Sequence, residues 1–177
     1  MGRYSQADLL VITLGGNAVL PVGSSGTIDA QFATTRRSMA PVAALIRSGV
    51  RVVLSHGNGP VVGNIVLRNE AAKAQIPPMP LFICGADSQG GIGFMIQNAL
   101  RNELHLLGDR RPVATVVTQV EVDPSDPAFA DPTKPIGPFY GPEEAAALAA
   151  EKGWVMKEDA GRGIRRVVAS PEPKHIV

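Results

Sequence analysis

The hydrophobic residues at the start of the chain gather in short, dense runs. Residues 8 to 14, DLLVITL, form one apolar run rich in β-branched side chains, and residues 50 to 55, VRVVLS, form another. Runs of this length and composition are typical of buried strands in a parallel sheet. Glycines follow each run closely, so each predicted strand opens into a tight polar turn.

Between and after these strands, apolar residues recur at helical spacing. The segment from Ile28 to Arg47 predicts a helix, which Pro41 should kink or restart because proline removes a backbone donor. A second helix is predicted after the turn HGNGP, with Pro60 in its first turn. A third, long helix is predicted to open with ADSQGG at residues 86–91 and to continue through Leu107.

A further predicted strand, VATVVTQVEV at residues 113–122, continues the alternation of strands and helices. This order predicts right-handed β-α-β units and therefore an α/β fold with a parallel-rich sheet. Composition changes at Pro124, since six of the chain's 15 prolines lie between residues 124 and 142. A short Ala- and Glu-rich helix and a hairpin over residues 154–170 follow, which predicts a small α+β appendage.

The overall composition is that of an ordinary globular protein, with 45% hydrophobic residues, 19% charged residues and a formal net charge of +1. Scattered cations and few aromatic residues give no basis for a nucleic-acid partner. No apolar run approaches the ~18 to 20 residues of a membrane helix, and a signal-peptide core is absent, so we expect a cytoplasmic protein with no membrane partner. Cys84 is expected to be a buried hydrophobe, and no metal site is predicted.

The candidate chemistry begins at the ends of the first two strands, in LGGNA at residues 14–18 and SHGNGP at residues 55–60. The carboxyl ends of parallel strands form a ligand crevice, so the two loops should lie side by side. Glycine lets backbone N–H groups approach an anion. Either loop alone is equally well explained as a tight turn, whereas two matched loops favour binding of a small, partly charged ligand. His56 is expected to hydrogen-bond the turn rather than act as a base.

A single lysine, Lys134, stands among the prolines and glycines of DPTKPIGPFYGP at residues 131–142. Each proline fixes φ, so this lysine should be displayed on a semi-rigid arm that loses little entropy on meeting a phosphate. The alternative is an incidental lysine in a proline-rich surface loop. The later stretch KEDAGRG is either a solvated hairpin or a place where Glu158, Asp159 and Arg162 orient a lid.

Four blocks of this sequence, VITLGGNAV, VVLSHGNGPVVGN, VATVVTQVEVDPSDPAFADPTKPIGPFY and MKEDAGRGIRRVVASPEP, resemble carbamate kinase, of the amino acid kinase superfamily. The resemblance runs nearly end to end and implies a kinase that reversibly transfers a phosphoryl group from MgATP to carbamate, in arginine metabolism. It implies that Lys134 is a catalytic lysine reaching over the substrate pocket. The positions that match that pocket are Gly15, Gly16, Asn17, Gly57, Asn58 and Gly59.

The resemblance also implies a domain plan. Residues 1–123 would form the carbamate- or carbamoyl phosphate-binding lobe, residues 124–170 a protruding lid-like subdomain, and residues 171–177 the start of a connection to a nucleotide-binding lobe. That lobe, which would hold MgATP or MgADP, is expected to be absent from this chain, which would be truncated before it. A homodimer or a partner chain would cover the exposed sheet edge. Val61 departs from the glutamine that usually follows HGNGP. The alternatives are a non-catalytic small-anion binding module and a half-protein that pairs with a separate nucleotide-binding chain.

Overall fold

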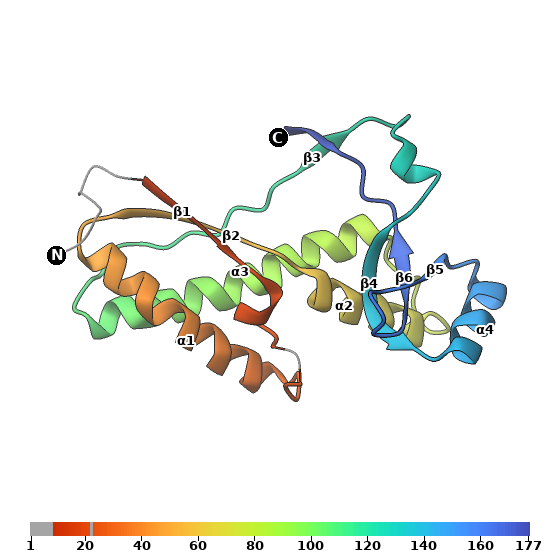
Figure 1. Cartoon of the computed structure of the whole chain (residues 1–177). Coiled ribbons are helices and arrows are strands. Elements are labelled where there is room, and N and C mark those ends of the chain that lie inside the picture. Colours follow the sequence, from red (N-terminus) through yellow and green to blue (C-terminus); the bar gives the residue numbers. More distant parts are fainter. Residues whose placement is uncertain (1–8, 22) are drawn as a thin grey trace. The chain divides into compact units, whose positions relative to one another are not determined.

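The computed structural model describes residues 9–21 and 23–177 (Figure 1). The elements in chain order are β1 (Leu9–Leu14), the 3-10 turn η1 (Gly16–Ala18), α1 (Ile28–Arg47), β2 (Arg51–His56), α2 (Gly59–Ala72), α3 (Leu81–Leu106), β3 (Val120–Val122), η2 (Pro127–Phe129), β4 (Lys134–Tyr140), α4 (Pro142–Lys152), β5 (Met156–Glu158), β6 (Ile164–Val168) and β7 (Pro173–Ile176). The chain divides into two compact units. Met1–Asn58 with Ala86–Val116 form the first, and Gly59–Gly85 with Val117–Val177 form the second.

The parallel pair of strands β1 and β2 defines the first unit. Their register runs from Leu9 opposite Arg51 to Leu14 opposite His56, which confirms two neighbouring parallel strands. Side chains alternate between the two faces of a strand. Leu14 is accordingly buried, whereas Val11 on the other face is exposed.

Helix α1 follows the start and stop signals in its sequence. The Thr27 hydroxyl caps the first turn by accepting a hydrogen bond from the N–H of Ala30 at 3.3 Å, and Arg47 lies in the last turn, where a cation suits the helix dipole. The helix continues as one element through Pro41, so it does not restart there, and the kink stays a prediction. Buried Met39 and Val42 lie on either side of this proline, and their packing outweighs one missing hydrogen bond.

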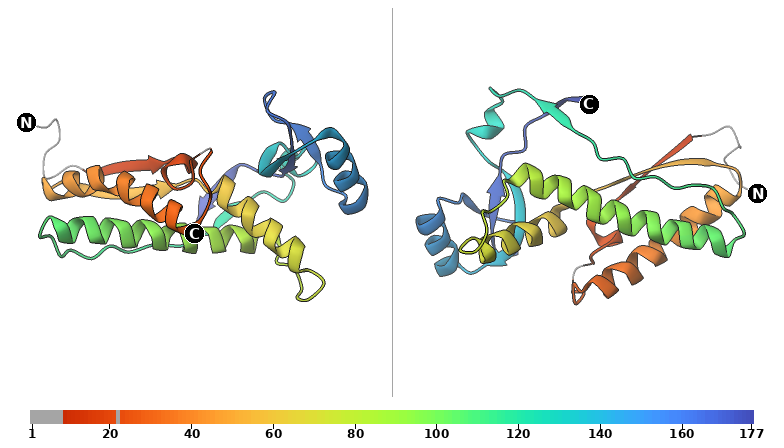
Figure 2. Two further views of the ribbon diagram at one scale, coloured as in Figure 1. Left: turned by 90° about the horizontal axis from the view of Figure 1, so that it is seen from below. Right: turned by 180° about the vertical axis from the view of Figure 1, so that it is seen from behind.

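In the first unit, α1 packs against the part of α3 that follows Ala86, and the two helices run beside each other in Figure 2. The rings of Phe32 and Phe94 meet edge to face with centroids 6.4 Å apart, and Arg36 pairs with Glu103 at 3.5 Å. The buried apolar residues of α3 in this unit are Ile92, Met95, Ile96, Ala99, Leu100 and Leu104.

The long helix α3 starts earlier than predicted. It begins at Leu81, so ADSQGG at residues 86–91 lies inside the helix rather than at its start. The apolar run from Leu81 to Cys84 supplies the first turn, and Cys84 is fully buried, as predicted. The two glycines of ADSQGG therefore lie inside the helix, where each costs roughly 1 kcal/mol relative to alanine.

The predicted strand at residues 113–122 is mostly wrong. Only Val120–Val122 forms a strand, and it pairs antiparallel with β7 in the second unit. In the first unit, residues 113–115 lie against α3, where the Gln97 side-chain amide donates to the carbonyl of Val113 at 2.9 Å. The described residues provide no neighbouring strand to pair with this segment. Val116 is consequently 77% exposed.

The second unit contains an antiparallel sheet with strand order β4-β6-β5, together with the pair β3 and β7. The predicted helix and hairpin are confirmed as α4, β5 and β6. Pro142 opens α4, and Gly153 closes it with φ +63°, a left-handed conformation that glycine adopts without strain.

The proline-rich arm predicted around Lys134 is a strand, β4. It lies at the edge of its sheet, where Pro135 and Pro138 can be accommodated because an edge strand has one side without ladder hydrogen bonds.

The structure therefore has an α/β fold in which β1 and β2 are parallel and the other described strand pairs are antiparallel. The domain boundaries placed at residues 123 and 170 stay predictions. A bilayer-spanning helix is not found in the part of the chain that the structure describes.

Truncating Met39 tests the core of the first unit, because this side chain is completely buried in α1. Met39→Ala should lower the free energy of unfolding by about 2–5 kcal/mol, through lost burial and the cavity left behind. Urea unfolding followed by far-UV circular dichroism measures this change. Ala33→Ser, an exposed change on the same helix, should stay within about 0.5 kcal/mol of the parent. Equal losses in the two variants would contradict the assigned core.

Candidate functional site

The two glycine loops leave neighbouring strands at the same edge of the β1–β2 pair. Leu14 and His56 are opposite each other in the parallel register, and the N–H of Gly57 donates to the carbonyl of Leu14 at 3.0 Å. The predicted placement of the loops side by side is confirmed. A ring nitrogen of His56 lies 3.3 Å from the carbonyl of Gly57, which matches the turn-bonding role expected of it.

The first loop presents backbone donors. Gly15 precedes the turn η1, and its carbonyl accepts from the N–H of Ala18 at 2.9 Å, while the carbonyl of Gly16 accepts from the N–H of Leu20 at 2.8 Å. The N–H groups of Gly15, Gly16 and Asn17 have no acceptor among the described residues. Consecutive N–H groups of this kind form a concave donor surface suited to an anion.

Three loop glycines are not explained by the packing of the described residues. Gly15 has φ −68°, and neither Gly57 nor Gly59 adopts the positive φ that favours glycine. A Cβ placed on any of the three meets nothing within 4 Å. A larger residue would therefore fit locally. What glycine provides at these positions is bare backbone at an open surface, which allows close approach by a ligand.

Asn58 is held in place by a residue of α3. Its side-chain amide donates to the hydroxyl of Ser88 at 2.8 Å, and Ser88 is fully buried. This contact fixes the orientation of Asn58 within the second loop. In the sequence, Ser88 stands only as one residue of ADSQGG, the predicted helix start, so its support of Asn58 was missed.

Helix α2 begins directly after the second loop, at Gly59. No side-chain acceptor in the described residues caps the N–H group of Val61. This N–H group and the helix dipole together favour negative charge at this end. The second loop and the start of α2 are thus both suited to bind an anion.

Lys134 is the first residue of β4 and belongs to the second unit. Its backbone pairs with Val168, and its exposed ammonium has no carboxylate partner among the described residues. It is a free point charge. Its reach over the glycine loops stays a prediction.

The residues expected to orient a lid behave differently from one another. Asp159 accepts from Arg162 at 3.0 Å and from Arg165 at 3.1 Å, and the hydrogen bond from Arg165 is the main reason that the pKa of Asp159 is lowered. Glu158 is exposed and forms no ion pair in the described part of the chain. The role of all three in a lid stays a prediction.

Arg165 was missed by the sequence analysis. Besides its pair with Asp159, its guanidinium donates to the carbonyl of Gly137 through Nε at 3.0 Å and Nη2 at 2.7 Å. The sequence feature that could have identified Arg165 is the pair of adjacent arginines in IRRVV. On a strand such neighbours point to opposite faces, so one of them must face the sheet's packed side.

Gly63 and Gly137 were also missed. A Cβ on Gly63 of α2 would lie 2.5 Å from both the Cα and the N of Gly137 on β4, so the two backbones touch directly. Buried Val62 and Ile136, their immediate neighbours, belong to one apolar cluster with Cys84. We call the contact between Gly63 and Gly137 the glycine joint.

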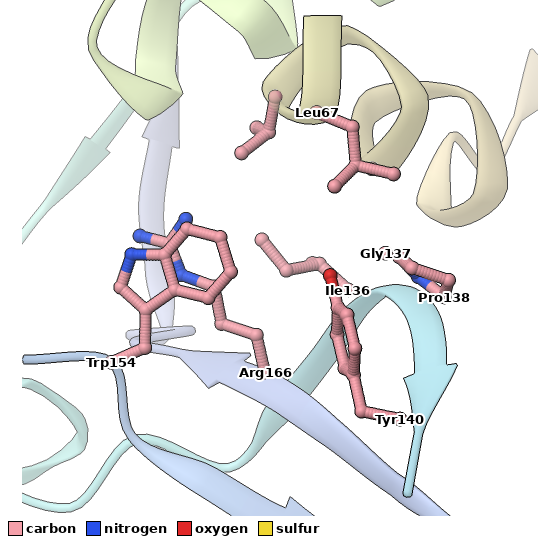
Figure 3. Close-up of a pocket in the computed structure, with 9 residues that line it drawn as sticks. Leu67, Ile136, Gly137, Pro138, Tyr140, Trp154 and Arg166 are labelled. Carbon is pink, nitrogen blue, oxygen red and sulfur yellow. The ribbon is translucent and has the colours of Figure 1, made fainter. Parts of the chain in front are cut away.

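A small pocket beside the glycine joint is shown in Figure 3. The Arg166 guanidinium stacks over the Trp154 ring at 4.3 Å, and Lys152 also lies over that ring at 4.9 Å. Burial lowers the pKa of Arg166. None of the predicted site residues lines this pocket. A group of three or more His, Cys, Asp or Glu side chains able to hold a metal is not found among the described residues.

Comparison with curated proteins finds carbamate kinases along nearly the whole chain. The carbamate kinase of Pyrococcus horikoshii is 53% identical over 169 residues, which covers 94% of this chain and 54% of that protein. The carbamate kinase of Trichomonas vaginalis is 47% identical over 169 residues, covering 95% of this chain and 54% of that protein. The chain spans about half the length of the curated relatives it matches. No family model matches the chain.

Solved structures give the same result. A carbamate kinase from Giardia lamblia bound to citric acid superposes with a TM-score of 0.91 at 44% identity, covering 98% of this chain and 56% of that one. The Giardia enzyme bound to AMP-PNP superposes with a TM-score of 0.81 at 44% identity, covering 98% of this chain and 55% of that one.

The ion pairs of Asp159 predict a pH dependence. Its folded pKa lies below the unfolded value of about 3.9, so its stabilising contribution is complete above that value and is lost as the pH falls toward the folded pKa. The melting temperature of Asp159→Asn should therefore lie below that of the parent at pH 6, with a gap that narrows below about pH 4. Asp87→Asn, at an exposed position without an ion pair in the described residues, should show no such narrowing. A gap that is constant with pH would contradict the assignment.

Proposed function

We propose that this chain, which is homologous to the carbamate kinases over 94% of its length, forms the carbamate-binding part of a carbamate kinase-type phosphotransferase. The observation that carries this proposal is the pair of glycine loops at the ends of β1 and β2. Gly15, Gly57 and Gly59 expose backbone that the described packing does not require. Together with Gly16, Asn17 and Asn58, they would bind carbamate or the carbamoyl phosphate made from it.

The reaction explains why backbone donors suit this site. An oxygen of carbamate attacks the γ-phosphorus of ATP, and the bond from that phosphorus to the β–γ bridging oxygen breaks, giving carbamoyl phosphate and ADP. Such transfers depend mainly on positioning two anions and neutralising charge on the transferring oxygens. Carbamate is already an anion, so no general base is required. The free N–H groups of Gly15, Gly16 and Asn17 fit the positioning role.

Lys134 would supply the positive charge that meets the phosphoryl group. An exposed ammonium with no carboxylate partner in the described residues is available to meet a phosphoryl oxygen. Its place on a strand that contains two prolines limits the backbone freedom lost on binding. Asp159 and Arg162 would steady the segment that carries it, and we assign Glu158 to the same group although its side chain forms no ion pair in the described residues.

The co-substrate MgATP or MgADP would bind mainly outside this chain. The Giardia enzyme is bound to AMP-PNP in a chain of which this sequence covers 55%. The whole protein, in the cytoplasm, would then act in arginine metabolism.

The open edges of the β1–β2 pair offer a place where the part of the kinase outside this sequence could join. Within the described residues β1 and β2 pair only with each other, and Leu9, Val11 and Val53 on the exposed face are 55%, 66% and 48% exposed. Two-stranded pairs with an exposed apolar face are marginal alone. We propose that the rest of the kinase, in the same or a separate chain, extends this sheet between helical layers, and that the whole forms a homodimer.

A non-catalytic module that senses carbamoyl phosphate is the second candidate function, favoured by the same free N–H groups of the first glycine loop.

Binding of carbamoyl phosphate tests the proposed pocket. Isothermal titration calorimetry of the purified chain should detect binding, and Lys134→Ala should weaken it about 10- to 100-fold, the cost of one charge-assisted contact. Lys73→Ala is the matched control, because Lys73 is also an exposed lysine but pairs with Glu70. Absence of heat together with absence of thermal stabilisation would overturn the pocket and the sensor alternative.

A coupled assay of ATP formation from carbamoyl phosphate and MgADP tests the role of the missing part. The chain alone should give no turnover, whereas a chimera with the unmatched part of the Pyrococcus horikoshii enzyme should give turnover that Lys134→Ala lowers about 100-fold. Turnover by the 177-residue chain alone, lost in Lys134→Ala, would contradict an external nucleotide site. Binding without turnover in the chimera would favour the sensor.

A further inference from the structure

Two elements that carry proposed substrate contacts meet at the glycine joint. Helix α2 starts at Gly59, the end of the second loop, and reaches Gly63 after one turn, a rise of about 6 Å. Strand β4 starts at Lys134 and reaches Gly137 three residues later, about 10 Å along the strand. Gly59 and Lys134 are thus each separated from the joint by a short, regular piece of backbone. All of these residues belong to the second unit.

On the helix side, the glycine joint leaves no room for a side chain at Gly63. Gly63 is buried, and its added Cβ would stand 2.5 Å from two backbone atoms of Gly137, where ordinary contacts are 3.4–4 Å. The obstacle is backbone, so rotating a side chain cannot relieve it. A single methyl group at Gly63 would have to push β4 away by about 1 Å, and shifts of that size in positioning elements can reduce catalysis by about 100-fold.

The strand side is held equally firmly. Gly137 has φ +74°, and the β4–β6 register shifts between Ile136 and Tyr140, so the strand bulges where it crosses α2. Two hydrogen bonds from Arg165 hold the carbonyl at the bulge, and Asp159 holds Arg165. Buried Ile136, just before the bulge, packs in the cluster that contains Val62.

We infer that the glycine joint, with Arg165, is a positioning device that fixes Lys134 relative to Gly59, the residue of the second glycine loop at which α2 begins. Gly63 and Arg165 touch no substrate in this scheme. They act by setting the path of β4, and hence where the Lys134 ammonium is presented. This inference rests on the proposed function, since it gives the reason why Lys134 needs a fixed position.

The test combines Gly63→Ala with Lys134→Ala in a double-mutant cycle, read by carbamoyl phosphate affinity of the purified chain. Gly63→Ala should weaken binding about five-fold or more in the parent background and less than about two-fold when Lys134 is already alanine. Gly90→Ala is the matched control, since Gly90 also lies inside a helix and its added Cβ meets nothing within 4 Å. Gly90→Ala should leave the carbamoyl phosphate affinity unchanged in both the parent and the Lys134→Ala background.

Hydrogen exchange without ligand provides the second measurement. Gly63→Ala should speed amide exchange at Lys134 and Ile136, whereas Gly90→Ala and Lys134→Ala should leave Ile136 unchanged. If Gly63→Ala does not fold, Arg165→Lys takes its place in both measurements, because lysine cannot make both hydrogen bonds to Gly137.

The outcomes separate the two proposals. Faster exchange in β4, with an affinity loss that depends on Lys134, supports the inference. Unchanged exchange overturns it, and so does an affinity loss that is the same in both backgrounds, because the joint would then be only structural. If the parent chain binds no carbamoyl phosphate, the proposed function fails, and the exchange rates at Lys134 and Ile136 alone decide whether the joint fixes β4.

Discussion

The parallel register of β1 and β2 is the constraint on which the candidate site depends. Because Leu14 stands opposite His56, the two strands end together and their glycine loops emerge at one edge. The hydrogen bond from Gly57 to the carbonyl of Leu14 ties the second loop to the end of the first strand. A slip of one residue would turn the side chains of one strand to the other face and separate the loops, so the buried face that sets the register also assembles the site.

Local sequence signals predicted the elements that are stabilised by their own residues. Thr27 and Arg47 mark the ends of α1, and Pro142 and Gly153 mark those of α4. The predictions failed where distant partners decide the structure. Val113 to Thr118 has strand composition but no strand beside it in the described residues, and a strand needs such a partner for its backbone hydrogen bonds.

The site shows the same division between local and tertiary information. The loops around Gly15 and Gly57 were predicted because glycine next to asparagine at a strand end is visible in the sequence. The glycine joint was not predicted, because nothing near Gly63 distinguishes it from other helical glycines until β4 is brought against it. Arg165 was missed for a similar reason, since its acceptor, the carbonyl of Gly137, is 28 residues away in the sequence.

The stacking of Arg166 and Lys152 on Trp154 gives the molecule an optical property of its own. Trp154 is the chain's single tryptophan, and it lies in the second unit. Indole emission responds to nearby charge, and here two cations sit over one ring at 4.3 and 4.9 Å. The intrinsic tryptophan fluorescence of this chain therefore reports on the second unit, which carries Lys134, and not on the unit that contains β1 and β2, so one native fluorophore can follow half of the molecule without any label.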